Sequence, residues 1–191
     1  PNLILLQSTD ELPVNWSGGI TAGTSVDVFS DGRFGVIATA SLSNKYRNRY
    51  ITRQAALNGD LDLDQTGNQF QTDQRILANA MLGFGLEVGE HRFRLTNLYI
   101  RDSLKRASLA QISDLTDDDD DLFQNTGWYE RELIDTQFVG ELEFGDLSID
   151  LRGGYAQTQR EAPNEWEFVY SRDLNPTGGF DDIYLNLQNG G

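Results

Sequence analysis

The sequence lacks cysteine entirely and has one histidine and four prolines among its 191 residues. Without cysteine it has neither a disulfide framework nor a thiolate metal site. Apolar residues make up 38% of the chain and aromatics 10%, with 19 glycines. That mixture excludes a disordered or collagen-like chain and is typical of a folded, glycine-rich β protein.

Positive charge is also scarce. There are 15 Lys and Arg residues against 30 Asp and Glu, a formal net charge of −15, which disfavours a nucleic-acid partner. No stretch approaches the roughly 20 apolar residues of a membrane-spanning helix, and nothing at Pro1 resembles a signal peptide. The mean hydropathy of −0.47 is still compatible with a transmembrane β-barrel, whose membrane signal lies in alternation.

Alternation with a period of two residues recurs in six long runs, the first over 16–29 and the last over 147–157. It predicts antiparallel strands with one apolar and one polar face. The fourth run is irregular: Phe93 and Leu95 share one face, whereas Leu98 and Ile100 fall on the other. This irregularity predicts a β-bulge near Thr96 or Asn97.

The connections between these runs alternate between two kinds. Short, glycine-containing turns are predicted at 31–32, 89–90 and 145–146, where glycine supplies the positive φ of a tight reversal. Long polar loops are predicted at 58–73, 113–126 and 158–191. Transmembrane barrels have this asymmetry, with short turns on the periplasmic side and long loops outside.

Strand length and aromatic placement indicate the same geometry. Aromatic residues lie in two groups, one near the short turns and one toward the long loops, as in the two girdles of a barrel. Phe34 and Tyr46 are 12 residues apart, which at about 3.3 Å per residue and a tilt near 40° spans on the order of 30 Å of membrane normal. A soluble β-sandwich remains as an alternative, although its strands are usually shorter.

The run WYERELIDTQFVGELEFGD at 128–146, followed by LSIDLRGGY at 147–155 and REAPNE at 160–165, resembles the barrel domain of TonB-dependent outer-membrane receptors. The likeness extends over 16–49 and 75–106. The resemblance implies a 22-stranded barrel, closed by an N-terminal plug, that imports a scarce ligand with energy passed on by TonB. No plug domain, TonB box or terminal aromatic after Gly191 is recognisable in the chain.

We therefore expect an all-β, antiparallel, up-and-down transmembrane β-barrel, of which the chain is an internal fragment with about six strands, because six strands cannot close such a barrel. The expected location is the bacterial outer membrane. The expected partners are outer-membrane lipid, a small nutrient ligand, and TonB through the missing plug domain. Siderophore, cobalamin and oligosaccharide all remain open as ligands. A passive porin is the alternative, as is a small structural barrel that recruits Asn2–Gln7 and Phe180–Leu187.

Candidate site residues follow from the two faces. We interpret charged residues on the polar face as lining a barrel lumen rather than contacting ligand directly: Lys45, Arg47, Arg75, Arg131, Asp135, Glu141, Asp150 and Arg152. Trp166, Phe168 and Tyr170 are candidates for contact with a sugar or an aromatic chelator. Their alternation with Glu165 and Glu167 favours an ordinary hairpin above the membrane.

Two acidic clusters invite a metal-site interpretation. Asp117–Asp121 is a run of five carboxylates, but adjacent side chains cannot all point at one ion, which favours a solvated acidic tip. Asp60, Asp62 and Asp64 begin like a calcium loop, yet the glycine arrives only at Gly67 and Gln71 stands where a bidentate Glu belongs. No metal is predicted at either cluster.

Signals for an enzyme are weak. His91 stands beside a short turn, far from the long loops, and no Gly-x-Ser-x-Gly elbow occurs in the sequence. Gly83-Phe84-Gly85 begins like a nucleotide-binding fingerprint, but Val88 replaces the third glycine and no helix follows. We therefore predict a protein that is not an enzyme and carries no cofactor.

Overall fold

A computed structural model of the chain describes residues 11–115, 119–173 and 184–186. Its backbone in these ranges forms one β-sheet, and none of these residues is helical. The strands are β1 (Trp16–Val28), β2 (Gly32–Ala56), β3 (Leu63–Val88), β4 (His91–Asp114), β5 (Asp119–Phe144), β6 (Leu147–Asp173) and the short β7 (Tyr184–Asn186). Within the described ranges, no helix has the length and apolarity to cross a membrane.

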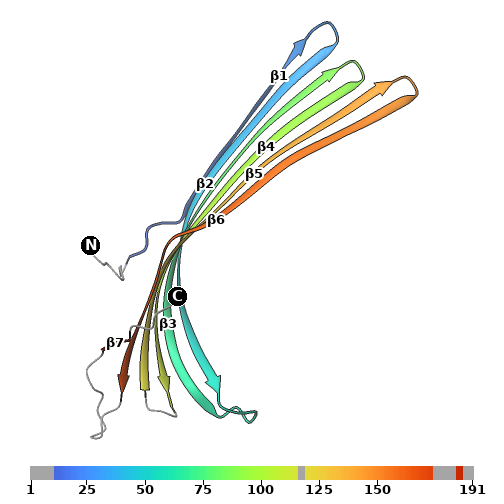
Figure 1. Cartoon of the computed structure of the whole chain (residues 1–191). Coiled ribbons are helices and arrows are strands. Elements are labelled where there is room, and N and C mark those ends of the chain that lie inside the picture. Colours follow the sequence, from blue (N-terminus) through green and yellow to red (C-terminus); the bar gives the residue numbers. More distant parts are fainter. Residues whose placement is uncertain (1–10, 116–118, 174–183, 187–191) are drawn as a thin grey trace.

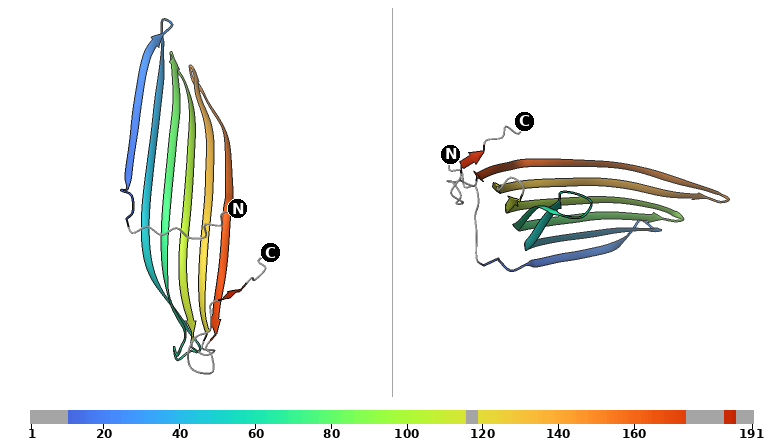
Figure 2. Two further views of the ribbon diagram at one scale, coloured as in Figure 1. Left: turned by 90° about the vertical axis from the view of Figure 1, so that its left-hand side faces the viewer. Right: turned by 90° about the horizontal axis from the view of Figure 1, so that it is seen from below.

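Each strand pairs antiparallel with its neighbour in sequence, in the order β1-β2-β3-β4-β5-β6-β7. Figure 1 shows the short turns that follow β1, β3 and β5 at one end of the sheet and the β2–β3 connection at the opposite end. In the views of Figure 2 the six long strands lie side by side in a single layer. The predicted all-β class, with six antiparallel up-and-down strands in one sheet, is confirmed.

The short turns agree with the predicted positions except at the first hairpin. Gly89 and Gly145 have φ of 58° and 63°, and each is the first residue of a two-residue turn, as a type II′ turn requires. In the first hairpin, Gly32 instead pairs with Val28 inside the sheet, and the turn is formed by residues 29–31. The positive φ there, 59°, belongs to Phe29.

The predicted long loops at 58–73, 113–126 and 158–191 are wrong over most of their length. Strands β2 to β6 contain 24 to 27 residues each, and they run through 63–73, 119–126 and 158–173. Most side chains on both faces are polar there, so long runs of apolar alternation are absent although the backbone ladder continues. Residues 116–118, 174–183 and 187–191, which include part of the acidic run at 117–121, lie outside the described residues.

The predicted bulge near Thr96 or Asn97 is also wrong. Both pairings of β4 keep a continuous register through these residues. The side-chain pattern changes there because apolar residues occupy both faces of β4. Register shifts occur elsewhere, one between β2 and β3 at Ala55 and Ala56 and one between β5 and β6. In the second, Trp128 pairs with Asn164 but Glu130 pairs with Glu161. Pro163 falls in this interruption, where its missing N–H removes nothing from the ladder.

The register assigns every long strand the same two faces. One face, which we call the apolar face, carries Ile20, Phe34, Leu82, Phe93, Phe138 and Ile149 and, up to the register shifts, every second residue along the strand from each of them. The residues between these lie on the opposite face, which we call the polar face. We call residues 16–43, 76–100 and 133–157, next to the short turns, the turn half. Residues 44–56, 63–75, 101–114, 119–132 and 158–173 form the far half. The apolar face of the turn half contains no Asp, Glu, Lys or Arg, and all of its residues are described.

Burial is inverted relative to a water-soluble protein. Within the described ranges the one buried hydrophobic residue is Ala110, whereas Gln69, Gln71 and Asp73 are among the buried polar residues. Large apolar side chains such as Ile20 (71% exposed) and Phe138 (39% exposed) are open to the surroundings. A single layer with one uncovered apolar face is unstable in water, since such a face must be buried against another apolar medium.

Candidate functional site

The polar face of the far half is hollowed into a cavity of about 940 Å³, lined by Asn15 and by residues of strands β2 to β6. We call it the cationic cavity. It contains seven positively charged side chains: Lys45, Arg47, Arg49, Arg75, Arg106, Arg131 and Arg160. It contains three carboxylates: Asp73, Asp102 and Glu165. The formal excess is therefore four positive charges, in a chain whose net charge is −15.

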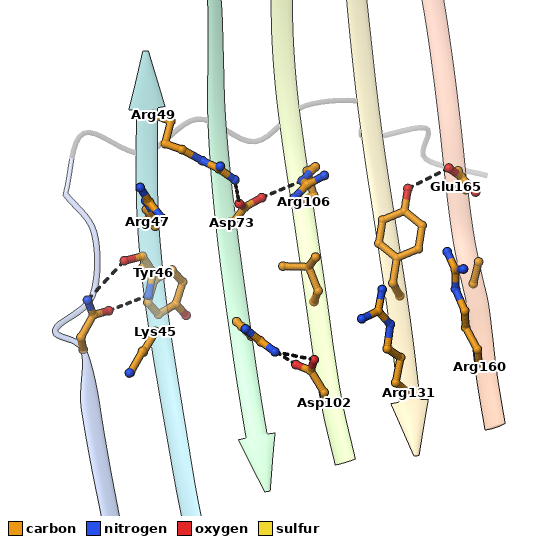
Figure 3. Close-up of a pocket in the computed structure, with 15 residues that line it drawn as sticks. Lys45, Tyr46, Arg47, Arg49, Asp73, Asp102, Arg106, Arg131, Arg160 and Glu165 are labelled. Atoms are coloured by element: carbon orange, nitrogen blue, oxygen red, sulfur yellow. Dashed lines mark hydrogen bonds and ion pairs between the residues drawn. The ribbon is translucent and has the colours of Figure 1, made fainter. Parts of the chain in front are cut away.

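The alternation of the strands explains how these charges come together. Lys45, Arg47 and Arg49 are spaced by two residues on β2, so all three point to the polar face. Register places Lys45 opposite Arg75 and Arg47 opposite Asp73. The same face continues across β4, β5 and β6, and Figure 3 shows the side chains gathered over strands β2 to β6.

In the cavity, the Asp73 carboxylate accepts hydrogen bonds from both neighbouring strands. Arg49 and Arg106 donate to its carboxylate from the two neighbouring strands, the second with Nε at 2.8 Å from Oδ1. Gln71 donates to the same carboxylate at 2.9 Å, and Gln69 donates to Gln71. Burial raises the pKa of Asp73, but the hydrogen bonds from Arg106, Gln71 and Arg49 outweigh it and leave the pKa below its ordinary value. Asp73 is thus ionised at neutral pH.

The other two carboxylates also have partners. Arg75 donates to both oxygens of Asp102, at 2.7 and 2.8 Å, in a bidentate pair. The Tyr129 hydroxyl donates to Glu165 at 2.7 Å, and this hydrogen bond raises the pKa of Tyr129 above its ordinary value. Every carboxylate of the cavity is therefore already hydrogen-bonded.

Four of the cations remain without such a partner. Among the described residues, the side chains of Lys45, Arg47, Arg131 and Arg160 make no hydrogen bond or salt bridge. Arg131 and Arg160 are direct cross-strand partners. Like charges that stand directly opposite each other destabilise a sheet, so this pair has a structural cost.

The eight predicted lumen-lining residues all lie on the polar face. Lys45, Arg47, Arg75 and Arg131 line the cationic cavity. The remaining four lie in the turn half, outside the cavity: Asp135, Glu141, Asp150 and Arg152. Arg152 approaches Asp150 to 3.9 Å, while Arg92 approaches Glu141 to 4.0 Å.

The predicted ligand-contact aromatics are not part of this cavity. Trp166, Phe168 and Tyr170 lie on β6 and pair with Thr126, Gln124 and Leu122 of β5. This register places them on the face opposite the cationic cavity.

The acidic clusters and His91 have local roles where they are described. Asn58 donates from its amide to Asp62 at 2.9 Å, within the β2–β3 connection. Ser171 donates to Asp121 at 2.7 Å. His91 accepts a hydrogen bond from the Glu143 backbone N–H at 3.1 Å, and its ring packs against Phe144 in a tilted arrangement. In the described part of the chain, no group of three or more His, Asp or Glu side chains is arranged to hold a metal ion.

Sequence reasoning missed three of the cavity's cations, namely Arg49, Arg106 and Arg160. Arg49 continues the two-residue spacing of Lys45 and Arg47, and that signal was sufficient to place it on the same face. Arg106 and Arg160 lie in stretches predicted to follow the end of a strand or to be loop, so alternation was not extended to them.

Comparison of the chain with models of known protein families finds no match, and no curated protein matches its sequence. Functional assignment therefore depends on the two faces of the sheet, on the cationic cavity and on the resemblance of the motifs at 128–165.

Proposed function

We propose that the chain forms part of the wall of a transmembrane β-barrel in a bacterial outer membrane. The observation that carries this proposal is the absence of charge from the apolar face of the turn half. On the same face of the far half, charges reappear at Arg101, Glu130 and Glu132, where Arg101 pairs with Glu130 at 2.8 Å. A charge-free apolar band that ends in charged residues is what a lipid-facing surface requires, since charges at the bilayer midplane are costly.

The height of the band supports the same proposal. On β5 the charge-free apolar face runs from Ile134 to Phe144, which is 11 residues. At about 3.3 Å per residue and a tilt near 40°, this corresponds to roughly 28 Å of membrane normal, close to the apolar band of about 25 Å of outer-membrane barrels. Trp16, Tyr99 and Tyr155 stand at the far edge of the band, as girdle residues do.

A barrel of this kind requires more strands than the sheet contains. Within the described residues, β1 pairs only with β2, and the turn half of β6 pairs only with β5. Unpaired backbone groups in lipid cost several kcal/mol each, so spanning sheets are closed. We propose that these two edges continue into further strands of a complete barrel of the 22-stranded type.

We propose further that this barrel takes up a scarce nutrient with energy supplied by TonB through a plug domain. The resemblance at 128–165 to TonB-dependent receptors supports this function. So does the geometry of the far half: strands of up to 27 residues reach beyond the band and present a polar, hollowed face. The interior face of an outer-membrane barrel is polar in the same way.

Site-directed labelling tests the membrane assignment. The chain contains no cysteine, so single substitutions Leu82→Cys and Phe138→Cys can each carry an environment-sensitive fluorophore. Met81→Cys and Gln137→Cys are matched controls, because each lies next to a test position but on the polar face. In liposomes with nitroxide-labelled acyl chains we expect strong quenching at 82 and 138 and weak quenching at 81 and 137. Equal quenching at all four positions would contradict a lipid-facing apolar side.

Uptake is tested separately in cells that lack the gene. We expect their growth to fail on one limiting nutrient and to be restored by the whole gene only when TonB is present. Restoration without TonB would identify a passive porin and would refute energy-coupled import while leaving the barrel assignment intact.

A further inference from the structure

The cationic cavity has an excess of positive charge, whereas the chain as a whole has a formal net charge of −15. It holds seven of the chain's 15 Lys and Arg residues. Repulsion among them opposes folding, and a hollowed surface of one sign concentrates its electric field and attracts ions of the opposite sign. Such an arrangement needs anionic groups that offset the repulsion among the cations.

The carboxylates of the cavity do not provide full compensation. Asp73 is bonded to Arg49 and Arg106, and Asp102 is bonded to Arg75. Lys45, Arg47, Arg131 and Arg160 therefore remain, with no hydrogen bond or salt bridge to any residue in the described ranges. They occupy two groups, with Lys45 and Arg47 on β2 and the directly opposed Arg131 and Arg160 on β5 and β6.

Two of the bonded groups have members on the strands between these two cationic groups: Asp73 and Arg75 lie on β3, and Asp102 and Arg106 lie on β4. The third group, Tyr129 with Glu165, lies on β5 and β6, the strands that carry Arg131 and Arg160. Leu104 and Ala162 add small apolar patches to the lining. Preorganised guanidinium groups bind carboxylate and phosphate oxygens through paired hydrogen bonds.

We propose that the cationic cavity binds a small organic polyanion whose carboxylate or phosphate groups engage Arg131 and Arg160 at one side and Lys45 and Arg47 at the other. The volume of about 940 Å³ lies at the upper end of the range for small-molecule sites and accommodates a ligand with several anionic groups. This inference deepens the proposed uptake function and rests on it, since it names the chemical class of the nutrient that the barrel admits.

Binding is tested with the full-length protein in detergent, using a trisulfonated hydroxypyrene dye as the anionic probe and fluorescence anisotropy as the readout. We expect citrate and pyrophosphate to displace the dye, and we expect the uncharged trisaccharide raffinose not to. The stronger competitor distinguishes carboxylate from phosphate chemistry. Affinity should fall as ionic strength rises, because the contacts are charge-assisted and partly exposed.

The decisive variant is Arg131→Gln/Arg160→Gln, for which we expect affinity for the dye to fall at least about tenfold, the loss expected for a charge-assisted hydrogen bond. Arg33→Gln/Arg94→Gln is the matched control, since it removes the same charge from the polar face of the turn half, outside the cavity. Its affinity should change less than about twofold. If Arg131→Gln/Arg160→Gln fails to fold, Lys45→Gln/Arg47→Gln makes the same test from the other side of the cavity.

Two results would overturn the inference. One is dye affinity that falls equally in the Arg131/Arg160 and Arg33/Arg94 variants, which would show attraction by overall charge alone. The other is displacement by raffinose as effective as by citrate, which would assign the cavity to neutral sugars. Both can occur while Leu82 and Phe138 report lipid contact, so failure of the polyanion inference is distinguishable from failure of the barrel proposal.

Discussion

The turn half and the far half of the sheet are built from the same strands, β2 to β6, with nearly unbroken register, yet their side chains face different surroundings. In the turn half, one face is apolar and free of charge, and large residues such as Leu82 and Phe138 are exposed on it. In the far half both faces carry mostly polar residues, and the buried side chains include Gln69, Gln71 and Asp73.

This difference shows that the backbone ladder and the side-chain pattern carry separate information. Hydrogen bonds between strands continue for 24 to 27 residues regardless of what the side chains are. In the far half, cross-strand polar contacts accompany the ladder, such as Thr72 to Asn48 at 2.7 Å and Gln65 to Asp114 at 3.0 Å. The side-chain pattern changes along the strand while the secondary structure does not, which is what the proposed barrel would need if it projects out of a membrane.

The largest expected effect comes from placing a charge in the apolar band. Leu82→Arg should destabilise the folded protein in liposomes by about 2–4 kcal/mol, the cost of Arg near a bilayer midplane. Urea titration followed by the gel shift of the folded barrel measures it.

Two controls sharpen this comparison of the halves. Met81→Arg adds the same charge one residue away on the polar face, and Asn48→Arg adds it to the far half on the same face as Leu82. Both should cost less than about 1 kcal/mol, as expected for surface substitutions. A loss at Asn48 equal to that at Leu82 would erase the distinction between the halves.

A steric substitution probes how closely the far half is packed. A Cβ atom added at Gly67 would lie 2.3 Å from the backbone oxygen of Gln111, so Gly67→Ala should cost about 1–3 kcal/mol through displacement of the β3–β4 ladder. Gly85→Ala in the turn half is the matched control, because its Cβ meets nothing within 4 Å. Denaturation midpoints of the two variants should differ accordingly, and equal midpoints would show that the ladder at Gly67 adjusts freely.

The next effect in size concerns the charged centre of the far half. Asp73→Asn leaves Arg49 and Arg106 without their shared carboxylate, and we expect a loss of roughly 1–2 kcal/mol at neutral pH for these partly exposed charge-assisted bonds. The folded pKa of Asp73 lies below its ordinary 3.8. Its contribution is therefore complete above that value and is lost as pH falls through the lower, folded pKa.

Denaturation midpoints measured from neutral to acidic pH check this sign. The gap between the wild type and Asp73→Asn should narrow once pH falls below about 4. Asp102→Asn is the control, because it removes a carboxylate that has a single cationic partner. Gln71→Glu is unsuitable as a control because it adds a second acid to the network. A gap that widens on acidification would contradict the direction of the Asp73 shift.

The sequence predicted the turn half better than the far half, for a physical reason. Apolar alternation at positions such as Ile20, Phe34 and Ile149 marks strand, face and turn together. Stretches such as 44–56 and 63–75 are polar on both faces and offer no such contrast, so they were predicted as loops or as the end of a strand. Their strand state depends on pairing with a neighbour and not on local preference.

The cationic cavity was only partly predictable for a related reason. Lys45 and Arg131 were placed on the polar face by alternation alone. Their convergence with Arg160 depends on the register of four strand pairings between residues far apart in sequence. Periodicity within one strand contains no information about the offset between strands.

The smallest expected effect concerns the short turns, which connect the strands at the end of the turn half. Gly145 has a φ of 63°, and a Cβ added to it meets nothing within 4 Å. Gly145→Ala therefore isolates the cost of the left-handed backbone, about 1 kcal/mol. Phe29 already bears that cost at φ 59°, and this residue is 85% exposed. In Phe29→Gly, relief of strain should offset the greater flexibility of glycine in the unfolded chain, so the change should stay within about 0.5 kcal/mol. Urea midpoints in liposomes measure the stability of both variants. A larger loss of stability for Phe29→Gly than for Gly145→Ala would contradict this expectation. It would mean that the exposed ring itself stabilises the folded state, as an aromatic side chain anchored at the border of the lipid would.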